Sequence, residues 1–524
     1  MAHVVRLGKA LAFAASLALF AFAVWYAWAA FMVPLELEIR EGTNWLLVLA
    51  KRAGVDIYDS RRVAFLNMNH GPMDLVFKTW ISSLFPRLAG HAVVRIFVLA
   101  APFVMLLTAR RARGNWTEAL LAAGALSLML ANVAIMMIVG RSDATLLCET
   151  ILACGLTHEL LVTRHRLWTN GRAIVLQLLL GACSATMFLT TWRVIPTIGI
   201  LLLLTLARQV SETNYRFWRT VFGSLGLFAL GFALVWGATF LLEVHGDFDL
   251  YFKHFFGYFM AGNGWGTFSG PRFTLWPPEL VDAHARLLAL TAGLALFALY
   301  RIRRERAQVI VWLLVLPVAW VTNAYGYWKN QGGGGLHYFT AFFVTVWFLI
   351  VHGLRGRVLE VASRPWWRPV MQLAFAGAFF FAYDWRPLIK RGQHLQELRV
   401  QSLQFLKNVA ARVGQEPVPG EDSHLYKRKY MGEVVDSGDV ADYFAATKYF
   451  GESFTRVYEA YLANLEAHPP KYLMAAGFDR GRMADTTSRR FNQLLHQRYR
   501  LAIEGPWTMI TNGGGATFLY ERKD

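Results

Sequence analysis

Long apolar stretches recur through the first 383 residues and restrict what this chain can fold into. A helix needs about 20 apolar residues to cross the roughly 30 Å hydrocarbon core of a bilayer. Hydrophobic residues make up 55% of the 524 positions, against about 45–50% in average soluble proteins. The pattern predicts spans at 10–33, 92–109, 117–139, 144–162, 173–191, 194–208, 218–242, 284–300, 307–322, 338–353 and 369–383. We therefore predict an all-α polytopic membrane protein with roughly eleven transmembrane helices.

The excess of basic residues indicates the direction of these spans. Lys and Arg number 53 against 35 Asp and Glu, which gives a net charge of +18. Basic clusters such as 109–116, 163–172 and 300–306 fall at every second connection, as the positive-inside rule requires. The N-terminus is predicted to be cytoplasmic and the C-terminus periplasmic or extracellular. The charge orients the chain among membrane lipids, so no nucleic-acid partner is expected, and the composition favours a bacterial inner membrane.

This orientation places the long connections and the tail on the outer side. Acidic, aromatic and glycine residues gather there, so residues 1–383 are predicted to form a transmembrane catalytic domain with its site at the outer face. Residues 384–524 are expected to form a small, soluble, extracytoplasmic α/β domain, since "NGGG" (512–515) separates two strand-like runs as in a hairpin. The outer loops are 34–91, 243–283 and 323–337, and the expected tail elements are helical pattern at 390–415 and 452–467 and strands at 471–477, 507–511 and 516–522.

Three glutamates stand where the chain leaves the first span. The stretch "VPLELEIREGTNW" contains Glu36, Glu38 and Glu41. Glu41 begins a predicted surface helix, and a second one is expected at 67–85, with Pro72 close to its start. Each glutamate alone could be an ordinary solvated charge at the interface. A further acid on the same face makes a functional role for at least one of them the favoured interpretation.

That acid lies in "GRSDATLL", where Arg141 and Asp143 interrupt two apolar runs. Ionisable groups at membrane depth are costly unless they are paired or face a watery cavity. Arg141 and Asp143 are therefore either a structural ion pair that holds two helices together or part of a functional site. Arg193, in "TTWRVIP", occupies a very short outer connection. It either reaches to the interface or binds an anionic phosphate in bidentate fashion.

The outer segment "NAYGYWKNQGGGGLHYF" combines glycines, cations and aromatic rings. Four consecutive glycines let the backbone approach a ligand closely, and Lys329 and His337 flank them. A flexible linker would explain the glycines but not both cations. No P-loop is present, because the GxxxxGK[ST] order is absent. In the loop 243–283, the His and Asp residues match no trusted metal-ligand spacing, so no metal site is predicted.

Together these motifs resemble the GT-C superfamily of integral-membrane glycosyltransferases, which use polyprenyl-phosphate sugars and include protein mannosyltransferases and aminoarabinose transferases. The resemblance rests on "EGTNWLLVLAKRAGVDIY", "NHGPMDLVFKTWISSLFPRLAGHAVVRIF", "GRSDATLL" and "WKNQGGGGLHYF", in that order. It departs from the superfamily in offering glutamates instead of aspartates in the first loop, and His-Gly-Pro-Met around Pro72.

The resemblance implies inverting transfer of a hexosyl or pentosyl group from a polyprenyl-phosphate donor to a glycan, lipid or protein acceptor. It requires no nucleotide, and it leaves open whether a divalent cation assists. A carboxylate would be the general base and cations would stabilise the departing phosphate. The expected catalytic residues are Glu41, then Glu38, with Asp143 as second acid; the phosphate-binding residues are Arg193, Lys329, His337 and Arg141; the substrate-binding residues are His70, Tyr327, Trp328 and Tyr338.

Other functions remain open at this stage. A flippase or transporter of a lipid-linked glycan would also be multi-span, although transporters tend to contain inverted repeats and broken helices. A glycan ligase or polymerase would take an oligosaccharide diphosphate donor instead. A scaffold without activity is disfavoured by the ionisable groups at the outer boundary.

Overall fold

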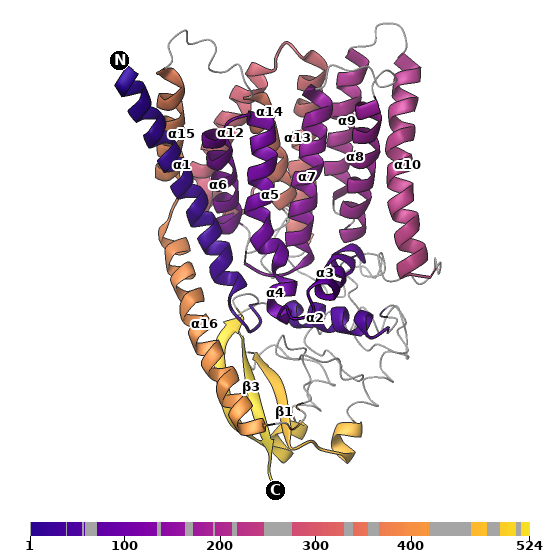
Figure 1. The fold of residues 1–524 in the computed structure, drawn as a ribbon, viewed down its shortest axis with the longest axis vertical. Coiled ribbons are helices and arrows are strands. Elements are labelled where there is room, and N and C mark those ends of the chain that lie inside the picture. Colours follow the sequence, from indigo (N-terminus) through magenta and orange to yellow (C-terminus); the bar gives the residue numbers. More distant parts are fainter. Residues whose placement is uncertain are drawn as a thin grey trace.

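The structure is a computed structural model of the 524-residue chain. It describes residues 2–37, 39–54, 57, 71–133, 138–162, 171–191, 194–211, 217–245, 275–329, 339–354, 366–414, 416, 418, 463–478, 493–509 and 515–524. Long helices run side by side and form a bundle, while short helices and a small sheet lie together at one end of it (Figure 1).

Each predicted span overlaps a long helix of the bundle. Within the described residues, six helical segments are long and apolar enough to cross a membrane, and three shorter apolar helices accompany them. The chain is thus a multi-pass membrane protein, as predicted. The bundle helices are α1 (Ala2–Phe31), α5 (Ile96–Arg113), α6 (Trp116–Val133), α7 (Ser142–Val162), α8 (Gly171–Thr190), α9 (Ile195–Ser211), α10 (Phe217–Glu243), α12 (Pro278–Arg301), α13 (Arg306–Lys329), α14 (Thr340–Gly353) and α15 (Trp367–Ala382).

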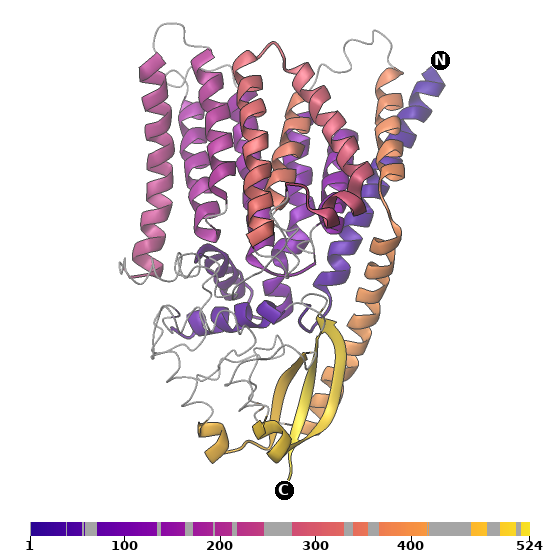
Figure 2. The same ribbon diagram turned by 180° about the vertical axis from the view of Figure 1, so that it is seen from behind.

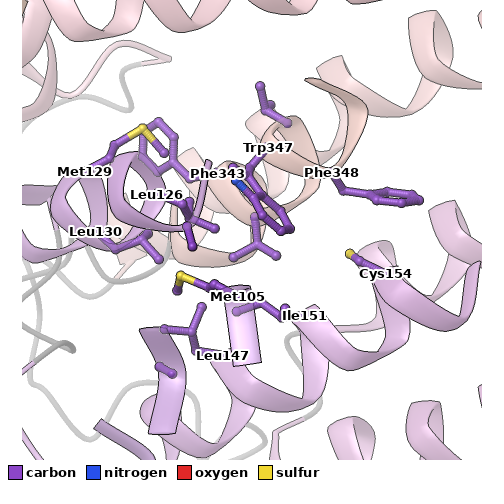
Figure 3. Close-up of a cluster of buried hydrophobic side chains, with 14 of the residues drawn as sticks. Met105, Leu126, Met129, Leu130, Leu147, Ile151, Cys154, Phe343, Trp347 and Phe348 are labelled. Atoms are coloured by element: carbon purple, nitrogen blue, oxygen red, sulfur yellow. The ribbon is translucent and has the colours of Figure 1, made fainter. Parts of the chain in front are cut away.

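A buried hydrophobic core joins α5, α6, α7 and α14. Figure 3 shows Met105, Leu126, Ile151 and Phe343 pointing toward one another from these four helices. All four side chains are buried, and close packing of such side chains holds membrane helices together where lipid is as apolar as the core. The bundle therefore forms one framework on which the polar end can be built.

Three short helices cover one end of this bundle: α2 (Ile39–Arg52), α3 (Met73–Leu84) and α4 (Gly90–Val94). Helix α2 is amphipathic and buries Trp45, Val48 and Leu49 against its neighbours. The guanidinium of Arg52 donates to Ser82 Oγ of α3 over 2.9 Å. Lys51 forms an ion pair with Glu243, at the end of α10. The predicted surface helices therefore exist and are fixed to the bundle end.

The tail extends from this same end. Helix α16 (Arg386–Val413) follows α15 and lies against the sheet (Figure 2). The three antiparallel strands are ordered β1-β3-β2, with β1 Tyr472–Phe478, β2 Tyr499–Met509 and β3 Gly515–Arg522. The expected hairpin is β2–β3, although β2 begins earlier than predicted. Leu35, from the loop after α1, shares a buried cluster with residues of α16 and the sheet.

Candidate active site

A fully buried ion pair fixes the loop that follows α1 to the bundle. Glu41 stands in the first turn of α2, and Arg95 lies between α4 and α5. Arg95 donates from Nε to Glu41 Oε1 (2.7 Å) and from Nη2 to Glu41 Oε2 (2.5 Å). Both side chains are 0% exposed. A buried charge of this kind is stable only with a partner and further hydrogen bonds. The pair therefore holds the start of α2 against the start of α5.

Arg95 also holds the chain that leaves α1. Its guanidinium donates to the backbone oxygens of Ala30 (3.0 Å), Val33 (2.5 Å) and Leu35 (2.6 Å). Five donor contacts from one guanidinium exploit the fixed fork geometry of arginine. Arg95 therefore sets the path of the segment between α1 and α2, which contains Glu36 and leads into Glu41.

Gly140, at the start of the predicted "GRSD" turn, is the point where α2, α3 and α7 meet. Its N–H donates to Glu41 Oε1 over 2.6 Å, and its carbonyl accepts from Lys78 Nζ over 2.9 Å. A side chain is excluded, because a Cβ at Gly140 would be 2.6 Å from the carbonyl oxygen of Val94. Leu37 N–H also donates to Glu41 Oε2 over 2.8 Å. Glu41 thus accepts four hydrogen bonds on two oxygens.

A second buried ion pair lies within α3 and is hydrogen-bonded to α7. Lys78 Nζ and Asp74 Oδ2 lie 2.7 Å apart, and both side chains are 0% exposed. Thr145, in α7, donates its hydroxyl to the other oxygen of Asp74. Since buried charges are tolerated when they are paired and hydrogen-bonded, this cluster fixes α3 over the beginning of α7. Neither residue was among the predicted site residues.

Asp143 and Arg141 form a looser and more open pair. Arg141 Nε lies 3.6 Å from Asp143 Oδ2, and the side chains are 11% and 10% exposed. Asp143 begins α7, where the positive end of the helix dipole favours a carboxylate. Glu36 and Glu41 are 1% and 0% exposed. Among the predicted acids in the described part of the chain, Asp143 is therefore the most accessible.

One carboxylate lies deeper in the membrane part. Glu149, in the third turn of α7, is buried and accepts from Thr190 Oγ1 over 3.1 Å. Its Oε2 makes no hydrogen bond within the part of the chain that the structure describes. The backbone oxygen of Thr190 accepts from Gly71 N–H over 3.0 Å, which ties the end of α8 to the beginning of α3. The α8–α9 connection thus reaches the same end of the bundle.

Several predicted site residues lie outside the described residues or are described only in their backbone. Lys329, with its neighbours Tyr327 and Trp328, ends α13. Glu38, His70, Arg193, His337 and Tyr338 fall outside the described ranges. Their roles therefore stay predictions.

Sequence reasoning also missed four functional candidates. These are Asp74, Lys78, Arg95 and Glu149. The signal available for each was an ionisable residue within or beside an apolar run, which in a membrane protein indicates a functional or pairing role. In the described ranges, no group of three or more His, Cys, Asp or Glu side chains could hold a metal ion.

Comparison with known proteins decides the fold. No protein-family model matches the sequence, and no curated protein matches it. The solved structure of ArnT from Cupriavidus metallidurans bound to undecaprenyl phosphate is similar, with a TM-score of 0.54 and 12% identity over 96% of this chain and 97% of that one. Apo ArnT from the same organism gives a TM-score of 0.52, 12% identity and coverage of 95% and 97%. The chain has a GT-C fold.

The GT-C fold covers both the helix bundle and the tail, since the match extends over nearly all of each chain. The fold class predicted from the sequence is therefore confirmed. Archaeal AglB oligosaccharyltransferase from Archaeoglobus fulgidus also aligns, at a TM-score of 0.45 and 12% identity, over 88% of this chain and 69% of that one.

Proposed function

We propose that this GT-C chain is an inverting glycosyltransferase that moves a sugar from a polyprenyl-phosphate donor to an extracytoplasmic acceptor. The observation that carries the proposal is the gathering of Glu41, Arg95, Lys78, Arg141 and Asp143 at one end of a GT-C bundle. A similarly folded protein, ArnT, binds undecaprenyl phosphate. Because positive and negative groups meet at one end of an apolar helix bundle, this end suits a lipid-borne anionic donor and a water-borne acceptor.

The proposed reaction is a single displacement at the anomeric carbon. The acceptor oxygen forms a bond to that carbon while the bond from the carbon to the donor phosphate oxygen breaks. The acceptor proton passes to a carboxylate acting as general base. The bonding electrons leave with the phosphate oxygen, which yields polyprenyl phosphate. One displacement inverts the configuration at the sugar.

The geometry favours Asp143 over Glu41 as the base. All four hydrogen bonds that Glu41 accepts come from Arg95, Gly140 and Leu37. Little lone-pair capacity remains for a proton from an acceptor. Asp143 is 8% exposed, and its side chain stands beside Arg141. Glu38 keeps its predicted role as the alternative base, and Glu41 is assigned to positioning the loop.

Cations would stabilise the charge that develops on the departing phosphate. Arg141 lies beside Asp143, with its Nε 3.6 Å from Asp143 Oδ2, and it can donate more than one hydrogen bond to a phosphate. Arg193, Lys329 and His337 remain proposed partners in this task. Lys78 is assigned to structure, because Asp74 and the carbonyl of Gly140 already occupy its ammonium group.

The decisive experiment compares surface glycans and lipid-linked precursors by mass spectrometry in a strain that lacks this protein. Loss of a single sugar residue supports the proposal, and wild-type protein should restore that sugar while Asp143→Asn should not. Loss of a whole glycan chain would indicate a ligase or polymerase. Accumulation of the precursor on the cytoplasmic side would indicate a flippase. Either of the last two results would overturn the proposal.

A further inference from the structure

A separate cavity lies within the bundle, away from the candidate active site. Its volume is about 210 Å³, and helices α6, α12, α14 and α15 line it. It extends from Glu118, in the first turn of α6, to Met129. Gly140 and the active-site charges follow the other end of α6, beyond Val133. The cavity therefore opens at the opposite end of α6, and its lining stops about one turn short of Val133.

Apolar side chains line this cavity for most of its length. Leu126 and Met129 form part of one wall, and Trp347 of α14 forms part of another. The indole nitrogen of Trp347 donates to the backbone oxygen of Ala122 over 3.0 Å and so is already satisfied. An apolar cavity of about 150 Å³ stays dry and binds benzene. A cavity of this size and lining suits a segment of a hydrocarbon chain.

The cavity also reaches the lipid-facing surface. Phe297 of α12 and Met371 of α15 both line it, and they are 41% and 44% exposed. Exposed apolar residues on membrane helices contact lipid tails. A ligand would therefore enter sideways from the bilayer, and a lipid is the class of molecule that can do so.

A positively charged group closes the polar end. Glu118 accepts from Arg113 Nε (2.9 Å), Arg368 Nε (2.9 Å) and Gln372 Nε2 (3.2 Å). Two guanidinium groups face one carboxylate, which leaves an excess of one positive charge. Arg113 Nη1 is buried and makes no hydrogen bond within the residues that the structure describes. Guanidinium groups bind phosphate oxygens well, so this end is complementary to an anionic headgroup.

We propose that this cavity binds one hydrocarbon chain of an anionic phospholipid, whose headgroup phosphate contacts Arg113 and Arg368. The apolar walls suit a flexible hydrocarbon tail, and the guanidinium groups at one end suit one anionic phosphate. The site is independent of the proposed sugar transfer, because none of its residues belongs to the candidate active site. The bound lipid would lie between α6, α12 and α15 and contact all three helices.

The test measures phospholipid retained by the purified full-length protein, by native mass spectrometry after transfer from nanodiscs of phosphatidylglycerol and phosphatidylcholine. Wild type is expected to retain one phosphatidylglycerol. Arg368→Gln, Ala125→Phe and Leu294→Trp should each lower that retention about tenfold, because they remove a charged contact or fill the cavity. Matched controls are Arg386→Gln, whose side chain is 86% exposed, and Leu230→Trp on the lipid-facing side of α10. Both should retain phosphatidylglycerol within about twofold of wild type.

Three results would overturn the inference. They are equal retention of phosphatidylcholine, loss of lipid in the control variants as well, and capture of polyprenyl phosphate in place of phospholipid when both are offered. Three cavity variants are used so that misfolding of one does not decide the outcome. Asp143→Asn serves as the internal reference, since it should keep the lipid whether or not the transferase proposal holds.

Discussion

Asp143 and Glu41 are acids at the same end of the bundle, but they differ in burial and in hydrogen bonding, and we therefore propose different roles for them. Glu41 is enclosed by Arg95, Gly140 and Leu37. Asp143 is 8% exposed, against 0% for Glu41, and pairs with Arg141 over 3.6 Å. A group that must exchange a proton with an acceptor needs an accessible oxygen, whereas a group that positions a loop needs fixed partners. These differences can be tested by changing each acid to its amide.

Asp143→Asn is expected to abolish sugar transfer and leave folding nearly intact. Loss of a general base reduces the rate by about 10²–10⁴-fold, whereas loss of a charge at the first turn of α7 costs about 0.3–1 kcal/mol. The measurements are transfer to the acceptor in membrane vesicles and the Tm of the purified protein. Asp384→Asn, at an exposed aspartate that pairs with Arg386, is the matched control. Transfer at the wild-type rate by Asp143→Asn would remove Asp143 from the mechanism.

Glu41→Gln is expected to damage the fold more than the chemistry. It leaves Arg95 buried without its carboxylate, and breaking a buried pair costs about 3–5 kcal/mol. The expected result is a lower yield of folded protein and a markedly lower Tm. A variant that keeps the Tm of wild type and loses all transfer would contradict this assignment and return the role of base to Glu41.

The sequence made part of this site predictable. "GRSD" and the first-loop glutamates stand out, because a charge beside an apolar run is conspicuous on its own. Arg95 and Lys78 were not recognised, since Arg95 also reads as an ordinary cation near the start of a span and Lys78 as one on a surface helix. What distinguishes them is the partner, and the contacts to Glu41 and Gly140 join residues 54 and 62 positions apart. Such pairings follow from the folded path and not from local pattern.

Helices α8 and α10 approach each other closely because each presents a glycine to the other. A Cβ at Gly181 would meet the backbone oxygen of Phe228, and one at Gly231 would meet that of Leu178. Small residues at such crossings let membrane helices pack through their backbones. The end of α8, where the carbonyl of Thr190 accepts from Gly71 N–H, depends on this placement of α8.

Gly181→Ala should therefore separate α8 from α10 and destabilise the protein by about 1–3 kcal/mol, as overpacking does. Gly237→Ala is the matched control on α10, because a Cβ there meets nothing within 4 Å. A helical glycine with room for a methyl group, changed to alanine, is expected to be neutral or to add about 0.5–1 kcal/mol. Thermal unfolding of both variants in the same detergent gives the comparison. Equal Tm values for the two would refute the close-packing argument.

Prediction of the elements succeeded where hydrophobicity alone sets them. The spans predicted at 144–162 and 218–242 correspond closely to α7 and α10. The span predicted at 92–109 is less regular, because the chain forms the short helix α4 and turns at Arg95 before α5 begins. That break lets the Arg95 side chain reach Glu41. A local apolar pattern contains no information on such a turn.

An apolar cluster joins the tail to the loop that follows α1. Apolar residues of α16, including Phe405 and Val409, pack on the sheet in the same cluster as Leu35 of the first loop. The sheet is thereby placed beside the end of the bundle that holds the candidate site. The proposed limit between the two domains, at residues 383 and 384, stays a prediction. Within the tail, an electrostatic contact between α16 and the sheet can be titrated.

Glu521 of β3 joins α16 to the edge of the sheet. It accepts from Arg412 of α16 over 2.7 Å and from Arg500 of β2 over 3.0 Å. The hydrogen bond from Arg412, followed by that from Arg500, lowers the pKa of Glu521 below its ordinary value of 4.5. Folding therefore favours the ionised form, and the resulting stabilisation is present above pH 4.5. It is lost as the pH falls through the lowered pKa of the folded state.

Acidification should accordingly loosen α16 from β3, and Glu521→Gln should remove that part of the pH dependence. This pH dependence is measured by hydrogen–deuterium exchange of the full-length protein. At each pH, the protection of α16 and β3 in wild type is divided by the protection in the variant. The ratio cancels the intrinsic pH dependence of exchange. It should be greatest near neutral pH and approach one below the lowered pKa of Glu521. A ratio that stays constant through the acid range would show that Leu35, Phe405 and their apolar neighbours hold the tail without help from this carboxylate.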